Sequence, residues 1–293
     1  MPTGYGNLIG TFARSLMLNN NLRRILTPWI EEYMGISLSK LSDTKVPIFL
    51  SKRQIGSGDG EQKDLIAIEI EGKRGLVVSN ESLLSGLEDL IDRLDPTTVY
   101  SSYGFFEMSR ITLEYGISVW GPDWFLFCDN ETVNTETDPR VEQVDNIDLS
   151  TVDYDEFWHC DPQAITGFAI RQGENIAALA TISKRNEPVC EIGMDVSKNQ
   201  QGTGLGRAVV SSAARWVLKT GDIPMAVLSP FNIPSMRTLT SSGLRYLFQS
   251  MSGDTKEFKI PPQPLGTPRP KTKMYNLYPD WAINHQILPK KKE

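Results

Sequence analysis

Apolar residues recur at three- and four-residue steps in three stretches of the chain, which is the spacing of one face of an amphipathic helix. These stretches are residues 7–41, 83–94 and 205–219. In the first, Asn19, Asn20 and Asn21 would break or cap the chain between two helices. Its apolar stripe could face a membrane surface or a partner, but packing on the protein's own core is the more common use. A fourth helix is predicted at 232–242, with Pro234 in its first turn.

Short apolar or alternating runs between turn residues predict the strands. They lie at 46–50, 65–70, 76–78, 124–128, 141–144, 164–171, 176–183, 189–196, 225–228 and 246–248. Turn residues at 71–75 and 172–175 predict two hairpins. Because strands and helices alternate in both halves, the pattern predicts an α/β (α+β) protein.

Chain length and local composition predict two domains and a tail. Domain-size statistics favour about two domains for 293 residues. Residues 130–148 are acidic and rich in Thr and Asn, which is typical of a linker. Residues 260–273 contain five prolines, which disfavour regular structure. We therefore predict an N-terminal α/β domain at 1–135, a second domain at 136–255 and a proline-rich extension at 256–293.

The charge balance limits the classes of partner. Thirty basic and 36 acidic residues give a net charge of −6, which argues against nucleic acid as the default partner and is compatible with a cationic amine substrate. No apolar run approaches the length of about 20 residues that spans a bilayer. The first residues lack the basic region of a signal peptide. We predict a cytoplasmic protein without a membrane partner. The sequence leaves open whether the protein forms a homodimer.

The three cysteines, Cys128, Cys160 and Cys190, are too few and too scattered for a disulfide framework. Reduced, partly buried thiols are the expected state. The run His159-Cys160-Asp161 resembles a fragment of a metal site. Because no Cys-x-x-Cys or His-x-x-x-His pattern accompanies it, we predict no metal.

A glycine-rich loop at 199–207 joins the strand 189–196 to the helix 205–219. Its glycines, at alternate positions, leave the main chain bare at the start of the helix, where free amides favour an anion such as a phosphate. A dinucleotide fingerprint or a Walker A loop would each need glycine at position 207, which holds Arg207. A tight turn without a ligand is the alternative.

The spacing Gln201-x-x-Gly204-x-Gly206 resembles the acetyl-CoA pyrophosphate loop of the GNAT N-acetyltransferase superfamily. A second GNAT signature is matched by Asn232-x-x-Ser235 followed by Gly243-Leu244. The resemblance covers residues 140–252 and implies the GNAT fold, a mixed and mostly antiparallel sheet flanked by helices. The N-terminal half is loosely similar to that of some two-part GNAT proteins.

The resemblance implies transfer of an acetyl group from acetyl-CoA to an amine of a small molecule or a peptide. In the family, the strand before the loop bends away from its neighbour and pairs with the pantetheine arm. The cofactor-binding residues implied here are Met194, Asp195, Val196, Gln201, Gly202, Thr203, Gly204, Leu205, Gly206, Arg207, Asn232 and Ser235.

Glu191 matches the place where many GNAT members carry their general base. An ion pair with a basic neighbour across the sheet is the equally weighted alternative, and Asp195 is the spare candidate. The usual acid, a Tyr, is replaced by Leu239, and Tyr246 is close in sequence. Otherwise water or Ser235 protonates the CoA thiolate, or the protein is a non-catalytic acyl-CoA-binding module.

Two further expectations concern the site. Cys190, next to Glu191, suggests an acyl-cysteine route, but a small buried side chain is the favoured role because no histidine is near in sequence.

Only the short segment 149–161 lies where the family places its acceptor-lining helices. We therefore expect the N-terminal half to complete the acceptor site. The candidate lining residues are Trp120, Trp124 and Phe125, with the core of their own domain as the alternative.

Overall fold

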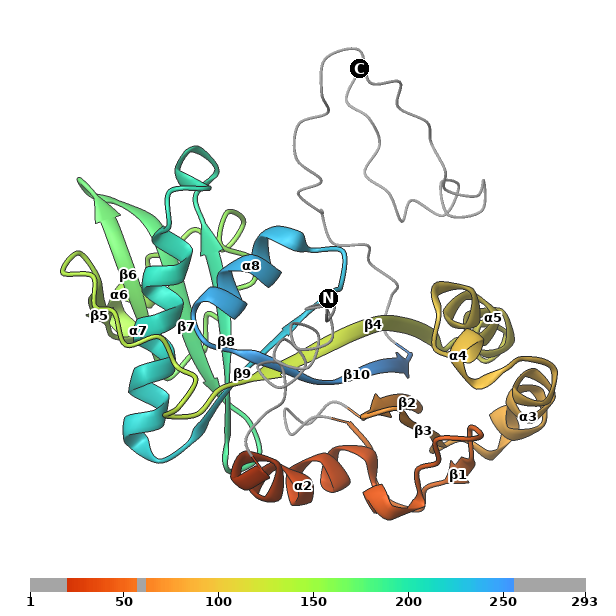
Figure 1. Ribbon diagram of the computed structural model, residues 1–293. Coiled ribbons are helices and arrows are strands. Elements are labelled where there is room, and N and C mark those ends of the chain that lie inside the picture. The colour runs from red at the N-terminus through yellow and green to blue at the C-terminus, as the bar shows by residue number, and fades with distance from the viewer. Residues whose placement is uncertain (1–19, 57–61, 256–293) are drawn as a thin grey trace, which may run out of the picture.

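The computed structural model describes residues 20–56 and 62–255 of the chain (Figure 1). The strands are β1 Ile48–Leu50, β2 Leu65–Ile70, β3 Lys73–Val78, β4 Ser118–Phe127, β5 Glu142–Val144, β6 Thr166–Gln172, β7 Asn175–Lys184, β8 Val189–Val196, β9 Ile223–Leu228 and β10 Arg245–Asp254. The α-helices are α2 Asn20–Met34, α3 Leu84–Arg93, α4 Pro96–Val99, α5 Ser102–Thr112, α6 Asn146–Leu149, α7 Leu205–Thr220 and α8 Ile233–Ser241. Short 3₁₀ turns lie at η1 Leu38–Lys40, η2 Glu81–Leu83, η3 Leu113–Tyr115 and η4 Lys198–Gln200.

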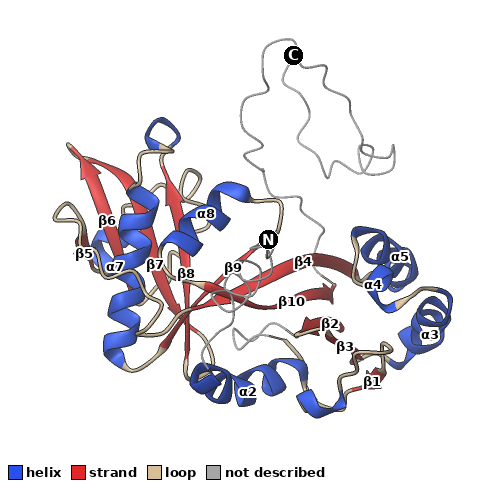
Figure 2. Cartoon of the chain, in the orientation of Figure 1, coloured by secondary structure: helices blue, strands red, loops and turns tan. Residues whose placement is uncertain are grey.

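All of these strands join one mixed sheet in the order β1-β3-β2-β10-β4-β9-β8-β7-β6-β5. The pairs β1–β3 and β8–β9 are parallel, and the other neighbours are antiparallel. Helices cover both faces of the sheet (Figure 2). The predicted fold class, a mostly antiparallel sheet flanked by helices, is confirmed.

The sheet is continuous across the predicted domain boundary. Strand β4, from the N-terminal half, lies between β9 and β10, which come from the C-terminal half. It pairs with β9 from Trp124↔Leu228 to Phe127↔Met225 and with β10 from Arg245↔Phe127 to Asp254↔Ser118. The division at 135/136 stays a prediction, but the hydrogen bonds of the central sheet join the two halves.

Four apolar clusters hold the helices on the sheet, and the smallest packs Leu149 of α6 on Val144, Ala169 and Leu179. Helix α2 buries Leu22, Leu26 and Ile30 against β2, β4, β9 and β10, so its stripe packs on the protein's own core as expected. On the opposite face, α7 packs with α8 over β6 to β9 and α3 to α5 pack over β2 and β3. The first part of the helical pattern, residues 7–19, lies outside the described residues, as does the proline-rich extension from 256 onwards.

Several elements of the N-terminal half differ from the sequence prediction, among them helix α5 and strand β4. Helix α5 was not predicted, and two of its apolar side chains, Tyr103 and Phe106, are 56% and 61% exposed, so its pattern does not mark one buried face. Strand β4 begins at Ser118, whereas the sequence predicted a start at position 124. The prediction missed the first part of the strand because Gly121, Pro122 and Asp123 interrupt its apolar run.

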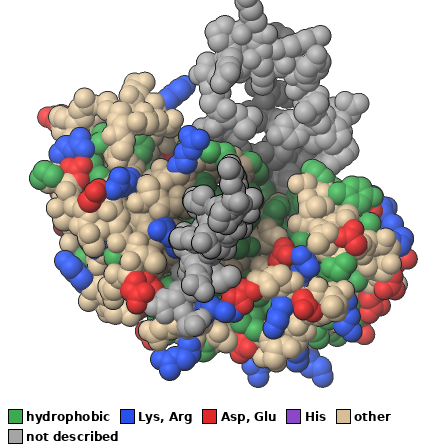
Figure 3. Space-filling model, in the orientation of Figure 1, with side chains coloured by type: hydrophobic (Ala, Val, Ile, Leu, Met, Phe, Trp, Pro, Cys, Tyr) green, Lys and Arg blue, Asp and Glu red, His purple; other side chains and the backbone are tan. Residues whose placement is uncertain are grey.

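Figure 3 shows acidic and basic side chains interspersed on one face of the molecule, with apolar side chains gathered over α5. No helix in the described ranges is long and apolar enough to cross a membrane.

Candidate active site

Strands β8 and β9 separate in the middle of the sheet. They pair only from Val189↔Ile223 to Glu191↔Met225. Beyond that point β8 stays paired with β7 as far as Val196, while β9 stays paired with β4 as far as Leu228. The facing edges of β8 and β9 therefore diverge after Glu191, which is the arrangement that the resemblance predicted for the pantetheine arm.

A cavity of about 230 Å³ occupies this divergence. Its lining residues are Asp123, Trp158, His159, Glu191, Ile192, Gly193, Met194, Ala226, Val227, Leu228, Ser229, Asn232, Ser235 and Leu239. Side chains alternate between the two faces of a strand. Because consecutive residues of β8, Glu191 to Met194, all line the cavity, it is open to both faces of the sheet. One face carries α7 and α8, and the other carries the segment that contains Trp158 and His159.

The glycine loop lies on the α7–α8 side. Gly202 and Gly204 have φ values of +76° and +87°, and an added Cβ at either would meet nothing within 4 Å. Glycine is therefore favoured at both positions by its backbone conformation, and the space beside them is open to a ligand. Gly206 instead allows close packing, since its Cβ would lie 3.2 Å from both Val196 and Thr238. The loop ends at Gly204, the N-cap of α7.

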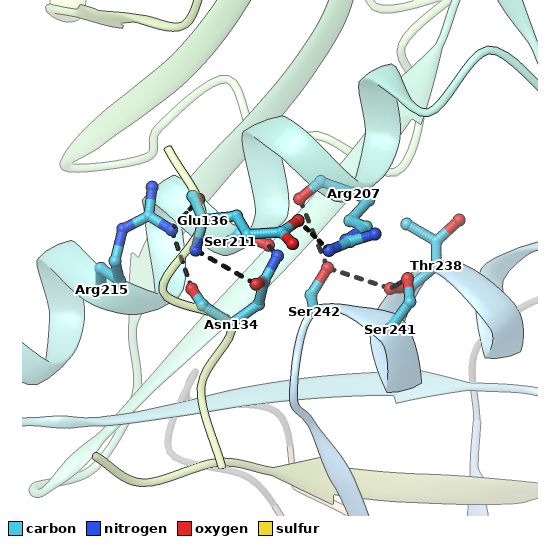
Figure 4. A network of polar contacts seen from close by, with 8 residues as sticks. All are labelled: Asn134, Glu136, Arg207, Ser211, Arg215, Thr238, Ser241 and Ser242. Carbon is cyan, nitrogen blue, oxygen red and sulfur yellow. Dashed lines mark hydrogen bonds and ion pairs between the residues drawn. The ribbon is translucent and has the colours of Figure 1, made fainter. Parts of the chain in front are cut away.

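Arg207 is engaged by a neighbouring loop (Figure 4). Its guanidinium forms an ion pair with Glu136, which lies in the segment after β4. The same segment is fixed on α7 by Arg215, whose Nη1 donates to the carbonyl oxygens of Asn134 (2.8 Å) and Glu136 (2.7 Å). A phosphate at this helix start would share the Arg207 guanidinium with the Glu136 carboxylate.

Helix α8 brings the second signature to the cavity. The Asn232 side chain caps the helix, accepting a hydrogen bond from the Ser235 amide at 3.3 Å. Leu239 lines the cavity from the same helix and is buried. The place of the family's usual tyrosine is thus an apolar part of the cavity.

Glu191 lines the cavity and also forms an ion pair. Its Oε2 accepts from Nε of Arg185 at 2.8 Å, and both side chains are largely buried. The ion pair that the sequence offered as an alternative is therefore present. Glu191 still lines the cavity while it forms this ion pair. Its role as a base stays a prediction.

Asp123 is a cavity residue that the sequence reasoning missed. It comes from β4 of the N-terminal half and accepts a hydrogen bond from Ser229 Oγ at 3.2 Å. Burial raises the pKa of Asp123 to about 6, and the Glu191 carboxylate adds to this rise. The local sequence gives no sign of this role, because Asp123 reaches Ser229 only through the long-range pairing of β4 with β9.

His159 also reaches the cavity, together with Trp158. Its Nδ1 lies 2.6 Å from Oδ1 of Asp195, and its backbone N–H donates to Oδ2 of the same carboxylate at 2.7 Å. Asp195, the spare base candidate, thus holds a histidine 36 positions earlier in the chain. The sequence pattern around His159 drew attention only as a fragment of a metal site.

Other predicted residues lie outside the set that lines the cavity. Tyr246 packs edge-on against Trp124 with ring centroids 5.3 Å apart, and burial raises its pKa to about 12. Phe125 stacks on Phe248 within the core below α2. Cys190 is buried in the α7 cluster, and burial raises the pKa of its thiol to about 11. Such a thiol carries little thiolate at neutral pH, which disfavours an acyl-cysteine route. Trp120 is also absent from the cavity residues.

Comparisons with known proteins bear on the family of this part of the chain. Residues 131–243 match the family model described as the acetyltransferase (GNAT) family. This part of the chain, which contains the glycine loop, β8, β9 and α8, therefore has the sequence pattern of the GNAT acetyltransferase family. The resemblance predicted from residues 140–252 is confirmed.

Solved structures give weaker likenesses. A GNAT-family structure from Novosphingobium aromaticivorans is 17% identical, with 47% of this chain and 66% of that chain covered and a TM-score of 0.40. A GNAT-family acetyltransferase from Colwellia psychrerythraea is 11% identical, with 63% and 77% covered and a TM-score of 0.41. A Salmonella typhimurium structure with its cofactor acetyl-CoA is 14% identical, with 41% and 96% covered and a TM-score of 0.31. No curated protein matched the sequence. At these TM-scores the assignment rests on the family match.

Proposed function

We propose that this protein is an acetyl-CoA-dependent N-acetyltransferase that transfers the acetyl group to an amine by direct attack in a ternary complex. The observation that carries the proposal is the cavity between β8 and β9, which is open to both faces of the sheet. One face can take the acyl donor and the other the acceptor, so the two can meet inside the sheet without a covalent enzyme intermediate. Bringing both reactants into one oriented site is a large part of the rate gain in such transfers.

The donor is assigned to the α7–α8 face. The amides of residues 202–207 receive the pyrophosphate at the start of α7, where the helix dipole favours negative charge. The free edge of β8 at Met194, Asp195 and Val196 pairs with the pantetheine arm. Asn232 and Ser235 border the arm from α8, where both already line the cavity.

The acceptor is assigned to the opposite face. Asp123 and Glu191 make this side acidic, which favours a cationic amine, either a small molecule or a peptide. Asp123 belongs to β4, so we propose that the N-terminal half is part of the acceptor site. The three free cysteines are all buried, in keeping with action in the cytoplasm.

The reaction forms a bond between the amine nitrogen and the acetyl carbonyl carbon and breaks the bond from that carbon to the CoA sulfur. A protonated amine is not a nucleophile, so a group in the site takes the proton. Glu191 and His159 both line the cavity and are the two candidates. With Leu239 at the usual acid position, the CoA thiolate takes its proton from water or from Ser235.

The test is turnover measured beside binding. Purified protein is mixed with acetyl-CoA and a panel of amines, CoA release is followed with a thiol reagent, and acetyl-CoA affinity is measured by calorimetry. Binding together with amine-dependent CoA release and an acetylated product supports the proposal. Tight binding with no release from any amine supports the alternative that Leu239 favours, a non-catalytic acyl-CoA-binding module.

A further inference from the structure

We propose that His159, held by Asp195, is the group that accepts the proton from the attacking amine. This inference rests on the proposed acetyl transfer and assigns a residue to its proton-transfer step. His159 and Trp158 line the cavity on the acceptor side, and the Trp158 ring packs against the imidazole. The imidazole is 35% exposed, so it is within reach of a ligand without being fully solvated.

The fold fixes the position of His159 through its neighbours. The Asp161 amide donates to Oγ1 of Thr181 on β7 at 2.9 Å, and the His159 amide donates to Asp195 on β8 at 2.7 Å. Gly193 permits this approach, because a Cβ at that position would lie 2.1 Å from the His159 carbonyl oxygen. Any larger residue at 193 would push the segment with His159 away from β8. The segment is therefore seated on the two strands at a defined depth beside the cavity.

The contact with Asp195 determines which ring nitrogen is free. An ionised carboxylate can only accept hydrogen bonds, so Nδ1 of His159 carries the proton that it donates to Asp195 Oδ1 across 2.6 Å. In the neutral ring Nε2 then has a lone pair and no proton. Nε2 is the nitrogen left for a group bound in the cavity. Asp195 also stabilises the imidazolium that forms when Nε2 takes a proton.

The ion pair of Glu191 makes His159 the better candidate for the proton acceptor. Oε2 of Glu191 already accepts from Nε of Arg185 at 2.8 Å, and taking up a proton would weaken that ion pair. Charged groups near His159 include Asp195 and Glu191 on β8, Asp123 on β4, Asp153, Asp155, Glu156 and Asp161 in its own segment, and Arg185, which is bound by Glu191.

In the proposed step the amine nitrogen attacks the thioester carbonyl of acetyl-CoA and its proton moves to Nε2 of His159. Collapse of the tetrahedral intermediate breaks the carbon–sulfur bond, and the sulfur leaves with the electron pair. The imidazolium then passes its proton to solvent, and the departing thiolate takes a proton from water or from Ser235. Atoms and charge balance with acetyl-CoA and the amine as the only reactants.

The first test is the ring tautomer, which needs no turnover. The chain has two histidines, His159 and His285, so His285→Gln leaves one imidazole for nitrogen-detected NMR. We expect the neutral ring of His159 to carry its proton on Nδ1, and Asp195→Asn in the same background to lose that preference. A neutral ring with its proton on Nε2 would overturn the proposal, because that nitrogen would have no lone pair to offer.

The second test is kinetic. His159→Gln keeps the backbone contact with Asp195 and should lower kcat by about a hundredfold or more, with acetyl-CoA affinity changed less than twofold. The acidic limb of the kcat/KM pH profile, where activity falls because the base is protonated, should disappear. His285→Gln is the matched control at the other histidine and should keep that limb, and Glu191→Gln should lose less activity than His159→Gln. Asp195→Asn should shift the limb and lower kcat more than it raises KM.

The outcomes separate the two proposals. If the wild type turns over, two results would overturn the role of His159 and leave the acetyl transfer standing. One is a His159→Gln variant whose pH profile keeps the limb, and the other is a His285→Gln variant that loses as much kcat as His159→Gln. A wild type that binds acetyl-CoA but releases no CoA with any amine contradicts the transfer, and the role of His159 falls with it.

Discussion

At the residue scale, the site brings together acidic groups from distant parts of the chain and keeps some of them in energetically unfavourable surroundings. Asp123 and Glu191 lie on β4 and β8, 68 positions apart, and line one cavity. No lysine or arginine forms an ion pair with Asp123 within the described residues. A carboxylate that is largely removed from water and has no ion-pair partner is costly for the folded state and useful for a cationic ligand.

The cost predicts that Asp123→Asn stabilises the protein at neutral pH. Because the pKa of Asp123 is raised to about 6, the native carboxyl holds a proton more tightly than the unfolded one. Its contribution to stability is fully present below about pH 4 and is lost as the pH rises through about 6. A rise of about two units corresponds to about 3 kcal/mol at most, so we expect Asp123→Asn to raise the free energy of unfolding by about 1–3 kcal/mol above pH 7.

The measurement is urea unfolding of wild type and Asp123→Asn at several pH values between 4 and 8. The gain should shrink towards zero near pH 4, where the wild-type carboxyl is protonated. Asp92→Asn, at an exposed position of α3, is the matched control and should change little. A gain that does not vary with pH would mean that the Asp123 charge is not the cause.

Sequence reasoning reached only part of the site at this scale. Glu191 was found through its place on the strand before the loop, and it does line the cavity. His159 and Asp123 were missed because each joins the site through long-range pairing. A histidine beside a cysteine gives no local signal for a contact with Asp195, and an aspartate within an aromatic run gives none for a contact with Ser229.

At the scale of elements, the glycine loop and its flanks were the most predictable part of the molecule. Strand β8 has the predicted bounds, and α7 begins at the predicted residue. Both follow from local rules, alternation for the strand and a glycine at positive φ before the helix. Strands β4 and β10 were each predicted only in part, since the two strands pair with each other over a long register that no local pattern reveals.

The loop assignment predicts that Gly204→Val weakens acetyl-CoA binding sharply. A branched side chain would occupy the open space beside Gly204, where the pyrophosphate is proposed to approach the amides. Because φ is +87° there, the substitution also strains the backbone. Calorimetry should show at least a tenfold loss of acetyl-CoA affinity.

A control at the other end of α7 separates the two effects. Gly221 caps the helix at φ +90°, also with nothing within 4 Å of an added Cβ. Gly221→Val should produce a similar loss of stability and leave acetyl-CoA affinity unchanged. Equal affinity losses in the two variants would point to strain alone and contradict the phosphate site.

At the scale of the whole molecule, the two halves share their central strands, so they depend on one another for folding. Strand β4 fills the place between β9 and β10 and hydrogen-bonds to both. Without it, both strands would present open edges, and the apolar side chains of the α2 cluster would lose their partners Phe125 and Phe127. The family match begins at 131, after β4 has ended.

We therefore predict that residues 136–293 produced alone do not fold stably, although they contain the GNAT signatures. Circular dichroism should show no cooperative thermal transition for this fragment, and acetyl-CoA should not bind. Co-expression with residues 1–135 should restore both, because β4 can pair with β9 and β10 from a separate chain. A fragment that melts cooperatively and binds acetyl-CoA by itself would show that β4 is dispensable for the fold.

The central claim is that the acetyl donor enters the sheet where β8 and β9 diverge. A crystal structure of the protein with acetyl-CoA bound tests it most directly. We predict the pyrophosphate on the amides of residues 202–207, the pantetheine arm along Met194 to Val196 and the thioester in the cavity beside Glu191 and His159. Acetyl-CoA bound elsewhere, with the divergence of β8 and β9 left free of the pantetheine arm, would contradict the account.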